Sequence, residues 1–189
     1  EATLARVWHA GFTVLAVTID TNAPGNRERD LHNGVPSLMS GNYLRMLPYV
    51  PAMLRRPRWT AQFLADRDAM FFPNIQLPGK GACPAADVRA MLTGAVVTWA
   101  DLSWLRQAWP GPILAKGVLT ADDTHRAFDT GCAGVIVSNH GGRQLYTCYP
   151  TVRALPEVVR AAHGQGPVLV DGGIRRGGDM LKALCMGAS

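Results

Sequence analysis

The chain has 189 residues, of which 48% are hydrophobic and 17% charged, an ordinary composition for a globular domain that buries its own core. Its formal net charge of +5 comes mainly from arginines spread over several loops, and no stacking motif accompanies them, so nucleic acid is not an expected partner. The cysteines lack Cys-x-x-Cys spacing, which argues against a metal site or a disulfide framework. Without a signal peptide or a long apolar run, a cytoplasmic location is expected.

The first two predicted elements are a helix and a strand. Leu4, Val7 and Trp8 at helical spacing predict a helix over residues 2–10. The apolar run 12–19 is rich in β-branched residues and predicts a strand that ends in Thr18 and Asp20. A turn-rich loop carrying arginines follows this strand.

Residues 31–92 are predicted to be an irregular, proline-rich insertion. Within it, the segment 42–59 combines large apolar side chains with several arginines and Trp59. Basic residues among aromatic ones suit a segment that lies on an anionic membrane. A lid that packs on the rest of the domain, or on a neighbouring subunit, explains the same pattern equally well.

Regular structure is predicted again after residue 95. Thr98 with Asp101, and Thr120 with Asp123, have the spacing of helix N-terminal caps. Buried strands are predicted over 113–117, 134–138 and 167–171, and helices over 151–163 and after residue 176. The predicted elements therefore alternate between strand and helix.

The stretch 134–145 carries the strongest functional signal. An apolar strand changes abruptly to Ser138, Asn139 and His140, then two glycines, with Arg143 three residues past the histidine. A base beside a cation at a strand end is a common way to build a site in α/β proteins. The alternative is that His140 only terminates the strand and Arg143 is a solvated charge.

The other strands also end in polar residues, namely Asp20, Lys116 and Asp171. In a (β/α)8 barrel the carboxyl ends of the strands converge on one active site, whereas an open doubly wound sheet gathers polar groups at one switch point. We therefore predict the α/β class and a partial (β/α)8 barrel over residues 1–189, with the 31–92 insertion after its first strand. Both chain ends fall inside predicted elements, so a piece of a longer protein is expected.

Four sequence stretches resemble the FMN-dependent α-hydroxy-acid dehydrogenase and oxidase family, which includes glycolate oxidase, L-lactate dehydrogenase and mandelate dehydrogenase. They are residues 18–20 with 27–30, 115–117, 138–145 and 171–177. The resemblance implies an FMN enzyme that oxidises a small 2-hydroxy acid to the 2-oxo acid. The long insertion resembles that of membrane-associated bacterial members, which implies a peripheral contact with the inner face of the cytoplasmic membrane. Family members often form homo-oligomers.

The resemblance also implies roles for individual residues. His140 would be the active-site base and Asp20 would hold its imidazole, while Arg143 and Arg27 would bind the substrate carboxylate. Lys116 would lie near the flavin N1 and C2 carbonyl. Together the residues expected at the cofactor are Thr18, Lys116, Ser138, Asp171, Gly172, Gly173 and Arg175.

The sequence departs from the family at Tyr146, where an aspartate usually follows Arg-Gln-Leu. The strands that the family has before and after this segment are also absent, so the chain alone is expected to be inactive. Two alternatives stay open: another FMN- or phosphate-binding barrel enzyme, and an incomplete barrel that acts as a membrane- or protein-binding module. The substrate and the electron acceptor are not determined by these residues.

Overall fold

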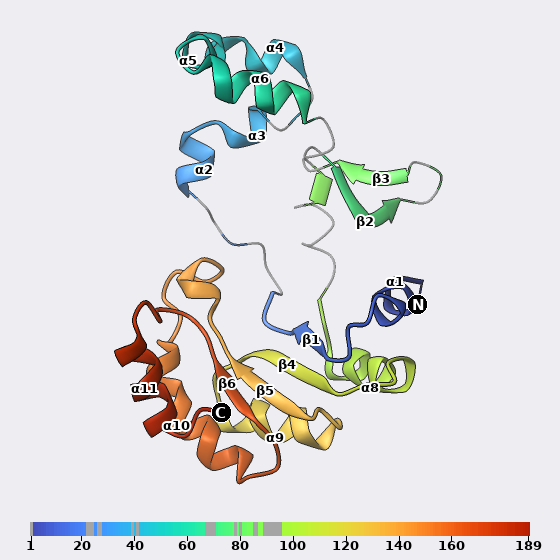
Figure 1. Cartoon of the computed structure of the whole chain (residues 1–189), viewed down its shortest axis with the longest axis vertical. Coiled ribbons are helices and arrows are strands. Elements are labelled where there is room, and N and C mark those ends of the chain that lie inside the picture. The colour runs from blue at the N-terminus through green and yellow to red at the C-terminus, as the bar shows by residue number, and fades with distance from the viewer. Residues whose placement is uncertain are drawn as a thin grey trace. The chain divides into compact units, whose positions relative to one another are not determined.

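The computed structural model describes residues 2–21, 25, 28–38, 40, 42–66, 71–77, 79, 81–84, 87–88 and 96–189. The chain divides into two compact units, one formed by Glu1–Asn26 with Ala95–Ser189 and the other by Arg27–Gly94 (Figure 1). The first unit holds the strands and helices predicted to form a barrel. The second corresponds closely to the predicted insertion.

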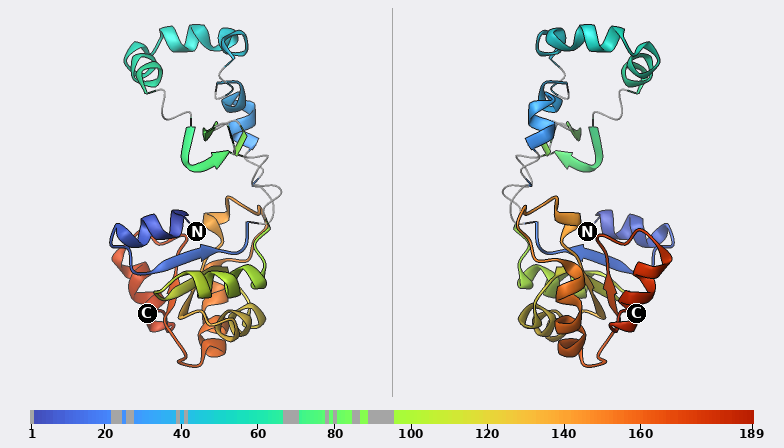
Figure 2. Two further views of the ribbon diagram at one scale, coloured as in Figure 1. Left: turned by 90° about the vertical axis from the view of Figure 1, so that its right-hand side faces the viewer. Right: turned by 90° about the vertical axis from the view of Figure 1, so that its left-hand side faces the viewer.

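The first unit is built on a four-stranded parallel sheet in the order β1-β4-β5-β6 (Figure 2). Its strands are β1 (Leu15–Thr18), β4 (Ile113–Val118), β5 (Gly134–Val137) and β6 (Val168–Val170). The helices of this unit are α1 (Ala2–His9), α8 (Trp99–Ala108), α9 (Ala121–Asp129), α10 (Thr151–Ala162) and α11 (Gly177–Cys185). This alternation of parallel strands and helices confirms the predicted α/β class.

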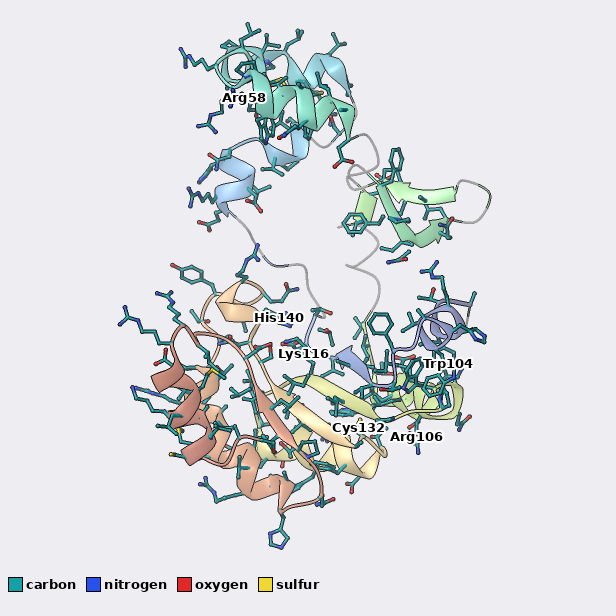
Figure 3. All side chains as sticks on the ribbon, viewed as in Figure 1. Arg58, Trp104, Arg106, Lys116, Cys132 and His140 are labelled. Carbon is teal, nitrogen blue, oxygen red and sulfur yellow. The ribbon has the colours of Figure 1, made fainter. Side chains whose placement is uncertain are left out.

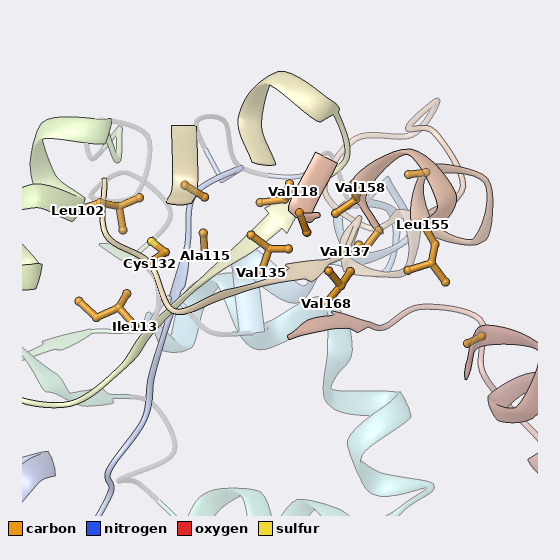
Figure 4. Close-up of a cluster of buried hydrophobic side chains, with 14 of the residues drawn as sticks. Leu102, Ile113, Ala115, Val118, Cys132, Val135, Val137, Leu155, Val158 and Val168 are labelled. Atoms are coloured by element: carbon orange, nitrogen blue, oxygen red, sulfur yellow. The ribbon is translucent and has the colours of Figure 1, made fainter. Parts of the chain in front are cut away.

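The two faces of the sheet have different environments. Ala115, Val135 and Val168 form one row across the strands and are buried in the core (Figure 4), where α9 and α10 pack against β4, β5 and β6. The adjacent row contains Lys116 and Ile136 and is only partly buried. Because successive residues of a strand point to opposite faces, Lys116 lies on the face opposite the helices, which is the inner face in a closed barrel.

The helix caps predicted from sequence are present. Thr98 Oγ1 accepts from the N–H of Asp101, and the Asp101 carboxylate accepts from the N–H of Thr98 at 2.8 Å, which completes a capping box. The Thr98 bonds lower the pKa of Asp101. Thr120 caps α9 through the N–H of Asp123. These bonds satisfy backbone donors that the first helical turn leaves free.

The carboxyl end of α10 offers a test of local strain. His163 has a φ of 44° in the left-handed region, which costs a residue with a Cβ about 1–2 kcal/mol. We expect His163→Gly to raise the free energy of unfolding by about 0.5–1 kcal/mol, since the greater freedom of glycine in the unfolded chain offsets part of the gain. Urea unfolding measures this change, and His163→Ala, which keeps the Cβ, should show no such increase.

The second unit is more regular than predicted. It contains α2 (Glu28–His32), α3 (Val35–Leu38), α4 (Tyr43–Met46), η1 (Leu47–Tyr49), α5 (Val50–Leu54), α6 (Pro57–Ala65), β2 (Phe71–Leu77) and β3 (Gly81–Pro84). The prediction of an irregular segment was wrong because Pro48, Pro51 and Pro57 occupy the first turns of helices, where no backbone N–H is needed. β2 and β3 pair in antiparallel fashion.

Candidate active site

Polar side chains from all four parallel strands lie at the carboxyl edge of the sheet. Asp20 follows β1, Lys116 is in β4, Ser138 and His140 follow β5, and Asp171 follows β6. Figure 3 labels Lys116 and His140 among them. Hydrogen bonds and ion pairs join them into two groups, His140 with Asp20 and Lys116 with Ser138 and Asp171. The parallel sheet thus brings together residues separated by as many as 151 positions (20 to 171).

The first group is an imidazole paired with a carboxylate. His140 Nε2 lies 2.7 Å from Asp20 Oδ1, and the two side chains are 22% and 26% exposed. An ionised carboxylate can only accept hydrogen bonds, so Nε2–H is the donor and Nδ1 is the ring nitrogen that remains to accept a proton. A base whose tautomer and orientation are set by a carboxylate is the arrangement used in general base catalysis.

The backbone at His140 is held in an unfavourable conformation. Its φ is 56°, and the N–H of His140 donates to Ser138 Oγ at 3.3 Å. Gly141 and Gly142 continue with positive φ, which glycine adopts without steric cost. Strain of this kind, held by surrounding bonds, is concentrated at functional sites.

The second group is centred on Lys116. Its Nζ donates to Ser138 Oγ at 2.7 Å and forms an ion pair with Asp171. Partial burial alone would raise the pKa of Asp171, but hydrogen bonds from Lys116 and Ser138, together with the charges of Lys116 and His140, outweigh burial and lower this pKa below its ordinary value. A fixed cation therefore lies beside the ionised carboxylate.

This lowered pKa predicts a small acid-sensitive contribution to stability. Because the folded-state pKa of Asp171 lies below the unfolded value of about 3.9, its contribution is present above that value and is lost as the pH falls through the folded pKa. The effect should be under about 1 kcal/mol, since the side chain is 43% exposed and the pair is screened. Urea unfolding at pH 7 and pH 3 should show a smaller acid-induced loss in Asp171→Asn than in the wild type.

The site fits a cofactor that carries hydroxyl groups and negative charge. Asp171 Oδ1 is buried and, among the described residues, has no hydrogen-bond partner, so it is available to a hydroxyl donor. Lys116 supplies positive charge next to it. At Gly173, where φ is 77°, a Cβ would meet no atom within 4 Å, which leaves the backbone open to a ligand.

The other predicted residues are less constrained. Thr18 ends β1 and is paired in register with Lys116. Arg143 and Arg175 are exposed, and neither forms an ion pair within the described part of the chain. Their backbone N–H groups donate to His140 O and to Asp179 Oδ2 respectively. Arg27 lies outside the described residues.

A cavity of about 530 Å³ lies at the same edge of the sheet, between α10 and α11. Asn139, Thr151 and Gly172 contribute to its wall, and Asn139 Nδ2 donates to the backbone oxygen of Tyr149 at 3.2 Å. Neither Asn139 nor Thr151 was predicted as a site residue from sequence. Tyr146, the departure from the family pattern, is 96% exposed and does not line this cavity.

No helix within the described ranges is long and apolar enough to cross a membrane. No group of three or more histidine, cysteine, aspartate or glutamate side chains in the same ranges could hold a metal ion.

Comparison with known proteins identifies relatives of this segment. The sequence profile of the FMN-dependent dehydrogenase family matches residues 1–189. Glycolate oxidase 1 of Zea mays is 40% identical over 189 residues, and the L-lactate dehydrogenase of Caulobacter vibrioides (strain NA1000 / CB15N) is 38% identical over 188. These matches cover 100% and 98% of this chain but 45% and 48% of the relatives, so the chain spans about half their length.

A solved structure gives the same result. The crystal structure of mandelate oxidase matches with a TM-score of 0.69 and 32% identity, over 99% of this chain and 44% of the other. Together with the four parallel strand–helix units, this likeness confirms the predicted fold as part of a (β/α)8 barrel.

Proposed function

The chain belongs to the FMN-dependent dehydrogenase family, and from that premise we propose that the whole protein oxidises a 2-hydroxy acid to the 2-oxo acid. FMN is the cofactor of the family. L-lactate, mandelate or a similar acid is the proposed substrate. The relatives include enzymes named for glycolate, L-lactate and mandelate, so the choice among these acids is part of the proposal.

The observation that carries this proposal is the His140–Asp20 pair beside Lys116 and Asp171. Oxidation of an alcohol carbon removes two electrons and two protons, so the site needs a base and an electron acceptor. His140 is the only histidine at the strand ends of the described chain that is paired with a carboxylate. If this cluster had no catalytic role, the polar side chains at the ends of four separate strands would have come together by chance.

In the proposed mechanism, FMN when bound would accept the two electrons together with one of the two protons. Arg143 and Arg27 hold the substrate carboxylate, since a guanidinium binds a carboxylate by two parallel hydrogen bonds. His140 takes a substrate proton at Nδ1, and Asp20 stabilises the imidazolium that results. Lys116 provides fixed positive charge at the cofactor.

The test is product formation by the whole protein loaded with FMN. Glycolate, L-lactate and mandelate are each supplied with an artificial electron acceptor, and the corresponding 2-oxo acid is quantified. We expect at least one acid to be oxidised. No 2-oxo acid from any of the three would contradict the proposal.

We also propose that the segment 42–59 contacts an anionic membrane surface. Leu44 and Leu54 are each 75% exposed, and Trp59, which stacks on Phe63, is exposed as well. Four exposed arginines accompany these apolar residues: Arg45, Arg55, Arg56 and Arg58. Exposed apolar side chains next to cations suit the boundary between headgroups and acyl chains.

Flotation with vesicles separates this proposal from a lid that packs on protein. The protein should float with phosphatidylglycerol vesicles and much less with phosphatidylcholine vesicles, and Leu44→Ser/Leu54→Ser should float less than the wild type. Equal flotation of the double variant would exclude a contact through this segment. A homo-oligomer is also proposed, and light scattering of the purified protein tests it.

A further inference from the structure

Gly117 has three unusual features at the end of β4. Its φ is 103°. The pairing of β4 with β5 shifts register there, since Lys116 pairs with Ile136 and Val118 with Val137, so Gly117 is a bulged residue. In addition, the space that a Cβ would take at Gly117 is filled by the Asp20 side chain.

From these features we infer that Gly117 is a positioning residue, whose missing side chain allows the Asp20 carboxylate to reach His140. The inference rests on the proposed function for its catalytic meaning, although the contact itself is structural. A Cβ at Gly117 would overlap Asp20 Cγ and Oδ1 and would lie 2.8 Å from Asp20 Cβ. Oδ1 is the atom that accepts the His140 bond.

A neighbouring cavity could accept the displaced Asp20 carboxylate. A cavity of about 240 Å³ is lined by Asp20, Gly117 and Thr98, together with Trp99 and Asp123. Asp20 Cγ lies on the axis about which the carboxylate end turns, so only a change of the Asp20 χ1 rotamer would move Cγ away from a Cβ at Gly117. Such a change, with a small adjustment at Asp20 Cβ, would swing the carboxylate towards this cavity rather than unfold the sheet. The bond from Asp20 Oδ1 to His140 Nε2 would then be broken.

A backbone hydrogen bond between β1 and β4 holds Asp20 close to Gly117. The N–H of Ile19 donates to Lys116 O at 2.9 Å. The residue before Asp20 is therefore bonded to the residue before Gly117. A shift of the Asp20 strand large enough to clear Cγ and Oδ1 as well would therefore break this bond. Rotation of the Asp20 side chain is the response with the lower cost.

Gly117→Ala in the chain labelled with ¹⁵N-histidine tests the inference directly. In the wild type we expect His140 to hold its proton on Nε2, with exchange of Hε2 slowed by the bond to Asp20. In Gly117→Ala that exchange should become about tenfold faster, as for the loss of one hydrogen bond to a charged group. His140→Asn assigns the signals.

Gly131→Ala is the matched control. Gly131 also has a positive φ, 89°, but the nearest atom to its Cβ position is Arg106 Cγ at 3.6 Å, an ordinary contact. This variant should carry similar backbone strain and leave the His140 signals unchanged. An unchanged Nε2–H signal in Gly117→Ala would overturn the inference.

If Gly117→Ala does not fold, a second variant tests whether overlap with Asp20 is the cause. Asp20→Gly/Gly117→Ala removes both the overlapping carboxylate and the Asp20 Cβ, so it should fold where the single variant does not, and an unfolded double variant would refute the positioning role. In the whole protein, Gly117→Ala should lower kcat more than it raises KM. If the histidine signals change as expected but the wild type oxidises no 2-hydroxy acid, the proposed function fails and the positioning of Asp20 stands.

Discussion

His140→Ala is expected to lower the kcat of the whole, FMN-loaded protein by about 10²–10⁴-fold, the usual contribution of a general base. The variant removes the imidazole that pairs with Asp20 at 2.7 Å, and no other histidine of the described chain forms such a pair. Steady-state oxidation of the preferred 2-hydroxy acid measures the loss. Bound FMN is determined from the visible spectrum so that loss of cofactor is not mistaken for loss of the base.

His125→Ala serves as the histidine control. His125 is exposed on α9, so its removal should leave kcat within about twofold of the wild type, as for surface substitutions away from the site. Turnover retained by His140→Ala would show that the base has been assigned to the wrong residue.

Leu155→Ala is expected to lower the free energy of unfolding by about 2–5 kcal/mol. Leu155 is fully buried in α10 within the core that covers the sheet, and truncation loses apolar burial and leaves a cavity. Chemical unfolding of the chain followed by circular dichroism measures this change.

Leu181→Ala makes the same truncation on a surface. Leu181 is 63% exposed on α11, so its removal should cost less than about 0.5 kcal/mol. Equal losses in the two variants would mean that the core lies elsewhere than between α10 and the sheet.

The strand ends of the barrel could be predicted from sequence because each change from apolar to polar residues is local. The run 134–138 is apolar and β-branched until Ser138, and it becomes β5 followed by the polar residues of the site. The capping boxes are equally local, since Thr98 and Asp101 lie three residues apart. Parallel strands then place their ends at one edge without further information.

Local sequence patterns could not predict which face of each helix packs against another element. Met180, Leu181 and Leu184 are the large apolar residues of the last helix, yet each is more than half exposed, whereas Ala183 is buried. Cys185, in the same helix, is also exposed. Helical periodicity identifies which residues share a face, but it does not say which face another element covers.

The close approach at Gly117 was also beyond the sequence. A glycine after Lys116 is compatible with a bulge, a turn or a bend. Only the coordinates show that the missing Cβ is replaced by the Asp20 carboxylate. The prolines of the 31–66 segment were similarly ambiguous, because a proline in a first helical turn and a proline in a loop look alike in sequence.

The most direct test of the flavin site is the absorbance of FMN bound to the whole protein after a 2-hydroxy acid is added without oxygen. We predict that L-lactate or mandelate bleaches the visible flavin band in the wild type, and that bleaching is at least about 10²-fold slower in His140→Ala. A flavin band that remains unchanged with every short or aromatic 2-hydroxy acid would contradict this prediction.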